Sequence, residues 1–159
     1  NNKNLSANIN VNIKDITNVK ELNNLNLKIF IEEGEIDFSK SQIMWKEDLK
    51  IILNESLLSL DDDGINLIGT VKLDFDDIDN FYSSFQINKS NRKDIDQIQL
   101  DFIYNINSKS LRFDNPKINK KQNSDLDRFL DIFNSSEDRV FNKITFKNFI
   151  NNFFRVYSG

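Results

Sequence analysis

The sequence predicts an α+β fold that is mainly β: a curved antiparallel meander sheet with one inserted helix and two C-terminal amphipathic helices. Several segments alternate apolar and polar residues strictly, and successive side chains of a strand point to opposite faces, so each segment makes a strand with one apolar face. The end of the chain instead spaces its apolar residues as a helix does. Strands and helices do not alternate along the chain, so we expect no parallel sheet.

The first two strands are predicted at Leu5–Ile13 and Leu25–Ile31, where every second residue is apolar. A tight reversal follows at Glu33–Glu35, whose central glycine can adopt a positive φ. Ile36 and Phe38 then begin the returning strand.

The alternation continues from Ile43 to Leu53, with a polar break at 46–48, and again before a hairpin at Asp61–Gly64. The next strand covers Ile65–Phe75. Gly69 lies in the middle of that strand on its apolar face, which indicates a bulge, a bend or a close backbone approach.

A helix is predicted near Ile78–Phe85, with Asp76 or Asp77 as its cap. Ile98–Ile106 follows as the most regular strand of the chain. A turn at 107–110 leads into the strand that begins at Leu111, and Pro116 restricts that strand to an edge or to its own end.

Two helices close the chain. The first is capped by Ser124 or Asp125 and has Leu126, Phe129, Leu130 and Phe133 on one side. The second has Thr145 as a plausible cap, and Phe154 widens its aromatic stripe. It is either a lid over the apolar face of the sheet or an amphipathic helix lying on a membrane. Its polar side is only weakly basic, which favours the lid, formed by Phe146, Phe149, Ile150, Phe153 and Tyr157.

Length and composition limit the domain organisation and the classes of function that the chain can have. The 159 residues suit a single domain, residues 1–159, with a β-rich part at 1–119 and a helical cap at 120–159. The chain starts without Met, so we expect it to be the C-terminal piece of a longer protein, with any membrane anchor upstream.

A net charge of −4 argues against nucleic acid as a partner. Cysteine and histidine are absent from the sequence, which removes the usual nucleophiles and bases. We therefore expect no enzyme, no cofactor and no metal.

Charged clusters have a functional and a structural interpretation. Asp61–Gly64 could hold calcium but lacks the spacing of a calcium loop, so a hairpin turn is favoured. A second acidic group could bind a metal, although helix N-terminal stabilisation is favoured; it consists of Asp74, Asp76, Asp77 and Asp79. A basic cluster could contact an anionic head group, although a solvated loop is favoured; it consists of Lys117, Lys120 and Lys121. Arg155 is expected to face water.

The segments Ile43–Leu58, Gly64–Gly69, Ile98–Asn105 and Leu111–Pro116 carry a resemblance. Together they resemble the C-terminal region of the AsmA-like proteins of bacterial envelopes, the TamB and YhdP type. The resemblance covers residues 24–119 and the closing Phe-rich helix. That short helix departs from the family pattern, and we expect it to be a terminal cap.

The resemblance implies a non-enzymatic envelope module in the periplasm, part of an inner-membrane-anchored parent, that takes part in lipid transport or outer-membrane maintenance. Its partners would be phospholipid acyl chains and other envelope proteins, and its sheet would be an apolar groove. The residues implied to form the lipid-binding floor are Leu25, Leu27, Ile29, Ile31, Leu67, Val71, Leu73, Leu100, Phe102 and Tyr104. Two alternatives stay open: a structural or interaction module whose own helices cover the core, and an enzyme that uses carboxylates, with or without calcium.

Overall fold

The computed structural model of the chain describes residues 6–17, 19–62, 64–135 and 143–159. The strands are β1 (Ala7–Asp15), β2 (Leu22–Glu32), β3 (Glu35–Asp37), β4 (Gln42–Trp45), β5 (Leu49–Asp61), β6 (Gly64–Phe75), β7 (Gln97–Asn105), β8 (Ser110–Ile118) and β9 (Lys121–Gln122). The helices are α1 (Ile78–Phe85), the 3-10 turn η1 (Lys89–Asn91), α2 (Ser124–Asn134) and α3 (Lys143–Ser158).

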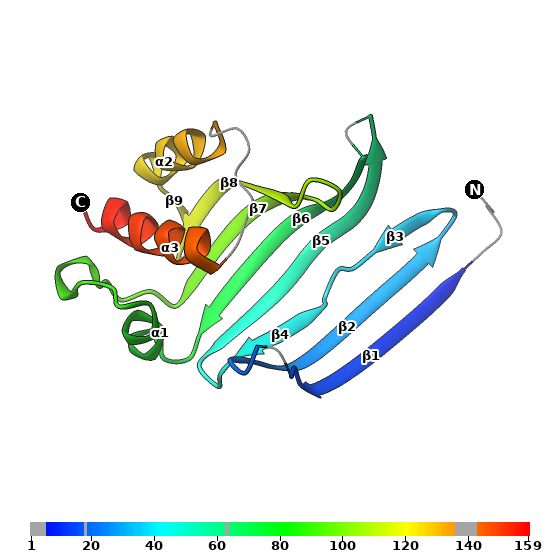
Figure 1. The fold of residues 1–159 in the computed structure, drawn as a ribbon, viewed down its shortest axis with the longest axis horizontal. Coiled ribbons are helices and arrows are strands. Elements are labelled where there is room, and N and C mark those ends of the chain that lie inside the picture. The colour runs from blue at the N-terminus through cyan, green and yellow to red at the C-terminus, as the bar shows by residue number, and fades with distance from the viewer. Residues whose placement is uncertain (1–5, 18, 63, 136–142) are drawn as a thin grey trace.

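All nine strands belong to one antiparallel sheet, in the order β1-β2-β3-β5-β6-β7-β8-β9, with β4 paired to both β2 and β5 (Figure 1). Most neighbours in the sheet are consecutive in the chain, so the topology is a meander; the exceptions are β3, which pairs with β5, and β4, which pairs with β2 as well as β5. The predicted α+β, mainly β class with an inserted helix and two C-terminal helices is confirmed.

Bulges in β5, β2 and β8 keep the apolar residues on one face although their spacing in the sequence changes; the one in β8 lies between Phe113 and Ile118, where Asn115 has a φ of 51°. In β5 the apolar positions pass from the odd-numbered Leu53 to the even-numbered Leu58, and the pairing with β6 shifts between them. Glu55 takes a φ of 47° there. A bulge adds one residue to one strand, which restores the alternation of faces. A second bulge does the same in β2, where Asn24 has a φ of 49°.

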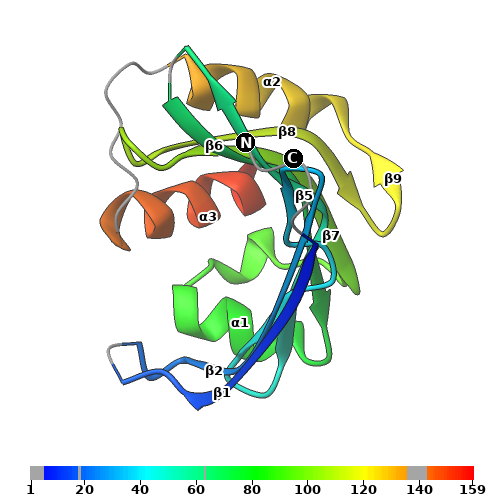
Figure 2. The ribbon, with the colours of Figure 1, turned by 90° about the vertical axis from the view of Figure 1, so that its right-hand side faces the viewer.

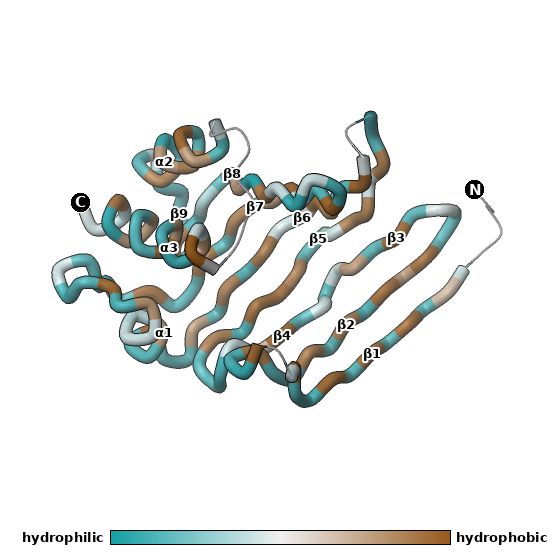
Figure 3. The backbone as a smooth tube through the Cα atoms, in the orientation of Figure 1, coloured by the Kyte–Doolittle hydropathy of each residue, from teal (hydrophilic) through white to brown (hydrophobic). Residues whose placement is uncertain are grey.

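The concave side of the sheet is apolar, whereas the convex side is mixed. Most convex positions are polar, but that side also includes Phe30, Ile52, Leu57, Ile68 and Ile103. Hydropathy alternates along the long strands in Figure 3. On the convex side, the Thr70 hydroxyl donates a hydrogen bond to Asp101 at 2.8 Å, and Lys72 pairs with Asp74 at 2.8 Å. The sheet curves strongly, and α1 and α3 lie on its concave side (Figure 2).

The helices pack at one end of the sheet. Asp77 caps α1, because its carboxylate accepts hydrogen bonds from the backbone N–H groups of Asp79 and Asn80. Helix α2 packs along β8, where Asn134 exchanges hydrogen bonds with the backbone of Phe113. The backbone of α3 runs closest to α2, η1 and α1, and α3 meets the strands mainly through its side chains. Phe154 of α3 is 0% exposed and packs its ring against Tyr82 at 5.0 Å.

Several local predictions are confirmed. Asp77 is the cap of α1, and Gly34 has a positive φ of 89° in the predicted reversal. Gly69 makes the expected close backbone approach, since a Cβ atom there would lie 2.7 Å from the Cα of Ser56.

Four local predictions are wrong. Phe38 does not belong to the returning strand, because β3 ends at Asp37. Asn123, rather than Ser124 or Asp125, caps α2 through its side-chain oxygen. Helix α3 begins before Thr145, at Lys143, so Thr145 is not a cap. Ile106 lies in the turn after β7 rather than in the strand. Leu5 and Asp63 lie outside the described residues.

Candidate functional site

An apolar cavity of about 330 Å³ lies between the concave face of the sheet and helices α1 and α3. Its lining is hydrophobic throughout and comes from β4 to β8 and from both helices. The lining residues are Trp45, Leu49, Ile51, Leu53, Leu67, Val71, Leu73, Phe81, Phe85, Leu100, Phe102, Tyr104, Leu111, Phe113, Phe146, Phe149 and Ile150. Small-molecule sites measure about 300–1,000 Å³, so the cavity is large enough for a small apolar ligand or part of a larger one.

The apolar floor of the cavity extends across the sheet toward β1, as the register of the paired strands shows. A single row of paired residues crosses the sheet through Tyr104, Leu67, Leu58, Ile36 and Ile31. Directly paired residues of antiparallel strands point to the same face. The apolar face is therefore continuous from the cavity to the strands that no helix of the described chain covers, as Figure 1 shows for β1–β3.

The ten residues predicted as an apolar floor share this face. Six of them line the cavity: Leu67, Val71, Leu73, Leu100, Phe102 and Tyr104. The four on β2 lie beyond it and are only partly buried: Leu25, Leu27, Ile29 and Ile31. Next to them on β1, Ile9 and Ile13 are 43% and 40% exposed. The floor thus has a covered part under the helices and an open part on β1 and β2.

The residues predicted as a lid on α3 fall into two groups. Phe146, Phe149 and Ile150 line the cavity. Phe153 is 2% exposed but packs its ring on Phe154 at 5.6 Å, away from the cavity lining, and Tyr157 is half-buried at the edge of the core.

Helix α1 forms one wall of the cavity and is held in place by hydrogen bonds of Tyr82. The rings of Phe81 and Phe85 pack at an angle of 38°, with centroids 4.5 Å apart, and both line the cavity. Behind them, the Tyr82 hydroxyl donates to the Lys93 carbonyl at 2.8 Å and accepts from the Lys93 N–H at 3.2 Å. Burial raises the pKa of the Tyr82 phenol, with the nearby charges as smaller contributions.

Three aromatic rings meet at one side of the cavity. The ring of Phe85 lies 5.4 Å from that of Trp45 and 5.6 Å from that of Phe146. The indole nitrogen of Trp45 is buried and has no hydrogen-bond partner among the residues that the structure describes. Buried donors are paired in the great majority of cases, so this N–H is unusual, although the nitrogen itself is not part of the cavity surface.

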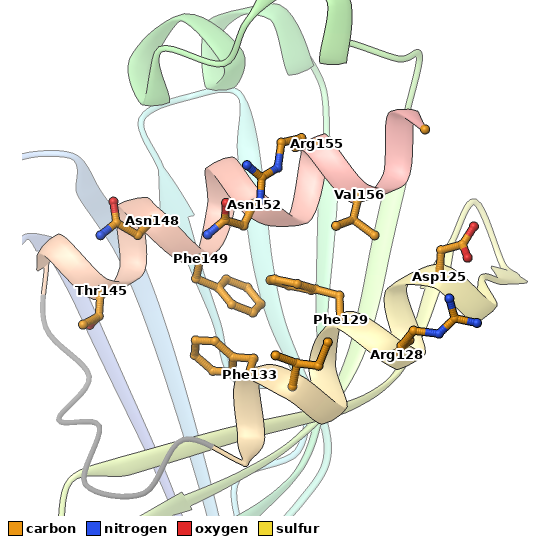
Figure 4. A pocket seen from close by; sticks show the side chains of 12 residues that line it. Asp125, Arg128, Phe129, Phe133, Thr145, Asn148, Phe149, Asn152, Arg155 and Val156 are labelled. Atoms are coloured by element: carbon orange, nitrogen blue, oxygen red, sulfur yellow. The ribbon is translucent and has the colours of Figure 1, made fainter.

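A second hollow of about 860 Å³ lies on the other side of α3, between α2 and α3 (Figure 4). Phe149 lines both hollows, and in Figure 4 it points toward Phe129 and Phe133 of α2. Polar groups surround these rings, Arg128 and Arg155 among them. This hollow is a mixed polar and apolar groove, which matches the predicted floor less well.

The charged clusters do not converge in the described part of the chain. Asp74 pairs with Lys72 and accepts from Gln97, while Asp77 caps α1. No group of three or more acidic residues there is placed to hold a metal ion. Lys120, in the turn before β9, is exposed, as is Arg155 on α3. The described helices are all too short or too polar to cross a membrane.

The sequence prediction omitted part of the lining. Ile51 and Leu53 on β5, Trp45 on β4 and Phe113 on β8 line the cavity without having been assigned to the floor. They belong to the same alternating segments, and in the register they lie on the same face as Leu73 and Phe102. The alternation of apolar and polar residues is therefore the sequence signal that could have identified them.

The chain matches no protein-family model, no curated protein and no solved structure.

Proposed function

We propose that the domain is a non-enzymatic lipid-handling module of a bacterial envelope, and that the concave face of its sheet binds acyl chains. The observation that carries the proposal is the wholly hydrophobic cavity, which continues into an uncovered apolar floor on β2 and β1. Each methylene group moved from water onto such a surface contributes about 0.8 kcal/mol. The resemblance of residues 24–119 to AsmA-like proteins supports the envelope setting and the phospholipid partners.

The shape of the site suits a chain better than a compact ligand. The covered part holds only about 330 Å³, whereas the open floor continues across several strands. An extended acyl chain can lie along both parts at once. The largely polar convex side, with Thr70 and Asp101, would face water while the chain is shielded.

A structural or interaction module with a self-covered core is the second candidate. The tight packing of α2 and α3 favours it, since Leu126, Leu130 and Phe154 are at most 1% exposed. In that case the cavity is a packing defect, and the open part of the floor is covered by protein.

Native mass spectrometry with lipid extraction tests the proposal. The purified domain is expected to carry or take up acyl lipids. Val71→Phe narrows the cavity and is expected to reduce uptake, while Ile103→Phe adds the same ring on the opposite face and leaves uptake unchanged. The absence of lipid in the wild-type protein, both before and after incubation with phospholipid, would overturn the lipid-handling proposal.

A further inference from the structure

We infer that the site takes a long acyl chain methyl end first, along one row of hydrophobic residues that crosses the strands, and leaves the head group in water. The inference rests on the proposed function and specifies the ligand class: long-chain amphiphiles, whatever the charge of their head group. It starts from the register of the sheet, which connects the cavity to the part of the floor that the helices leave open.

The row runs from β8 to β2 without a break. Each member is paired directly with the next across neighbouring strands, so all members point to the concave face. Three members line the cavity beneath the helices, and the next three lie outside its lining. In order, the row consists of Leu111, Tyr104, Leu67, Leu58, Ile36 and Ile31.

The other rows of the concave face that begin on β8 do not reach β2 in register. The row through Phe113 and Gly69 ends at the bulge in β5. The row through Ile118 and Ile51 continues to β4 and ends opposite the bulge in β2. A chain that leaves the cavity over Leu58 therefore crosses a continuous hydrophobic surface.

The length of the row suits a long chain. Its six strands are separated by five spacings of about 4.8 Å, so the row measures roughly 24 Å, of which the part from Leu111 to Leu67 takes up about 10 Å. A fully extended chain advances about 1.2 Å per bond, so octanoate is about 8 Å long and hexadecanoate about 18 Å. The shorter chain can lie wholly beneath the helices, whereas the longer chain must extend over Leu58 toward Ile36.

The polarity of the two ends of the row sets the direction of the chain. The cavity surface consists of apolar atoms only, so a head group placed there would lose its hydration without gaining a hydrogen bond, which is costly for a polar group and more so for an ion. At the other end, Ile36 and Ile31 are half-buried, and no helix of the described chain lies over β2 and β3 (Figure 1). A head group at that end stays hydrated, so the chain enters methyl end first.

Isotope-edited NOE spectra of the wild-type protein with hexadecanoate test the direction. With carbon-13 at the terminal methyl group, we expect NOEs to Leu67 and Val71, which line the cavity on either side of Gly69. With carbon-13 at the methylene next to the carboxylate, we expect NOEs to Ile36 and Ile31. The reverse pattern, or the same pattern for both labels, would overturn the inference while acyl-chain binding stands.

Calorimetric titration of three proteins with octanoate and hexadecanoate tests the path: wild type, Ile36→Asn and Ile13→Asn. Ile36→Asn places an amide in the row and should weaken hexadecanoate binding roughly fivefold while octanoate binding stays unchanged. Ile13→Asn is the matched control, because Ile13 lies on the same face about 20 Å from the row, opposite Leu25. Equal effects of the two substitutions, or equal effects of Ile36→Asn on both ligands, would overturn the path. The NOE spectra of the wild type decide the matter even where a variant does not fold.

Three ligands of equal chain length test the role of the head group: dodecanol, dodecanoate and dodecylphosphocholine. Their affinities for the wild-type protein should agree within about threefold and change little with added salt, because the head groups remain in water. A larger preference for any head group would overturn the inference and leave acyl-chain binding intact. If no ligand binds, acyl-chain binding fails and the inference fails with it.

Discussion

Gly69→Ala tests the packing of β5 against β6 at the bulge. Gly69 does not have a positive φ, so its backbone alone would accept alanine. The obstacle is space, because a Cβ atom would lie 2.7 Å from the Cα and 2.9 Å from the Cβ of Ser56. Carbon atoms in contact normally sit about 3.5–4.0 Å apart.

Ser56 cannot move aside easily. It is 0% exposed, its N–H donates to the Ser39 hydroxyl at 2.9 Å, and its carbonyl accepts from the Phe38 N–H at 2.7 Å. Its own hydroxyl donates to the Asn54 carbonyl at 2.9 Å. Relief of the clash must therefore come from separation of the two strands.

The expected cost follows from these contacts. Overpacking costs about 1–3 kcal/mol, and the reduced freedom of the unfolded chain returns about 0.4–1 kcal/mol. We expect Gly69→Ala to lower the free energy of unfolding by about 1–2 kcal/mol. For a chain of this size that corresponds to a Tm lower by roughly 2–8 °C.

Urea unfolding and calorimetry of four proteins measure the effect: wild type, Gly69→Ala, Ser56→Gly and the double variant. Ser56→Gly removes the Oγ and Cβ atoms that an alanine would strike, but not the Cα, so the double variant should recover part of the loss. A Gly69→Ala protein as stable as wild type, or more stable, would refute the close approach of the two strands.

Three further predictions concern the helices. Phe154→Ala should lower the free energy of unfolding by about 3–5 kcal/mol, whereas Leu60→Ala, at a side chain that is 80% exposed, should change it by less than about 0.5 kcal/mol. Asp77→Ala should cost about 1 kcal/mol in denaturant unfolding, because α1 loses its cap. Tyr82 has a pKa raised above its ordinary value of 10.0, chiefly by burial, so the folded state holds the phenol proton more tightly than the unfolded state. The protonated phenol therefore contributes its full stabilisation at pH values below its pKa in the unfolded chain. That stabilisation is lost as the pH rises through its pKa in the folded protein. Urea unfolding measured at increasing alkaline pH should accordingly show a smaller loss of stability for Tyr82→Phe than for the wild-type protein.

Contrary results would each identify a different error. Equal costs for Phe154→Ala and Leu60→Ala would mean that α3 does not pack as described. An Asp77→Ala protein of unchanged stability would mean that the cap is not formed. An alkaline stability profile that Tyr82→Phe leaves unchanged would mean that another group controls it.

The faces of the strands could be predicted from the sequence because side chains alternate with a period of two. That rule alone assigned Leu67, Val71 and Leu100 to one face, and the register agrees. The bulge in β5 also has a sequence signal, since the apolar positions change parity between Leu53 and Leu58.

Other features depend on tertiary placement. The cavity lies between the strands and the helices α1 and α3, and no local pattern in the sequence predicts how these distant elements are placed relative to one another. The unpaired indole of Trp45 likewise follows from the positions of Phe85 and Phe146, which come from other elements. The α2 cap was misassigned because Asn123, Ser124 and Asp125 are all good capping residues, and only backbone geometry selects one.

Methyl NMR of the domain with bound dodecanoate tests the central claim most directly. If the acyl chain lies on the concave face, its methylene protons should show intermolecular NOEs to the methyl groups of Leu53, Val71 and Leu100. The methyl groups of Ile68 and Ile103, on the convex face, should show none. NOEs confined to Ile68 and Ile103, or the absence of any intermolecular NOE at saturating ligand, would contradict the account.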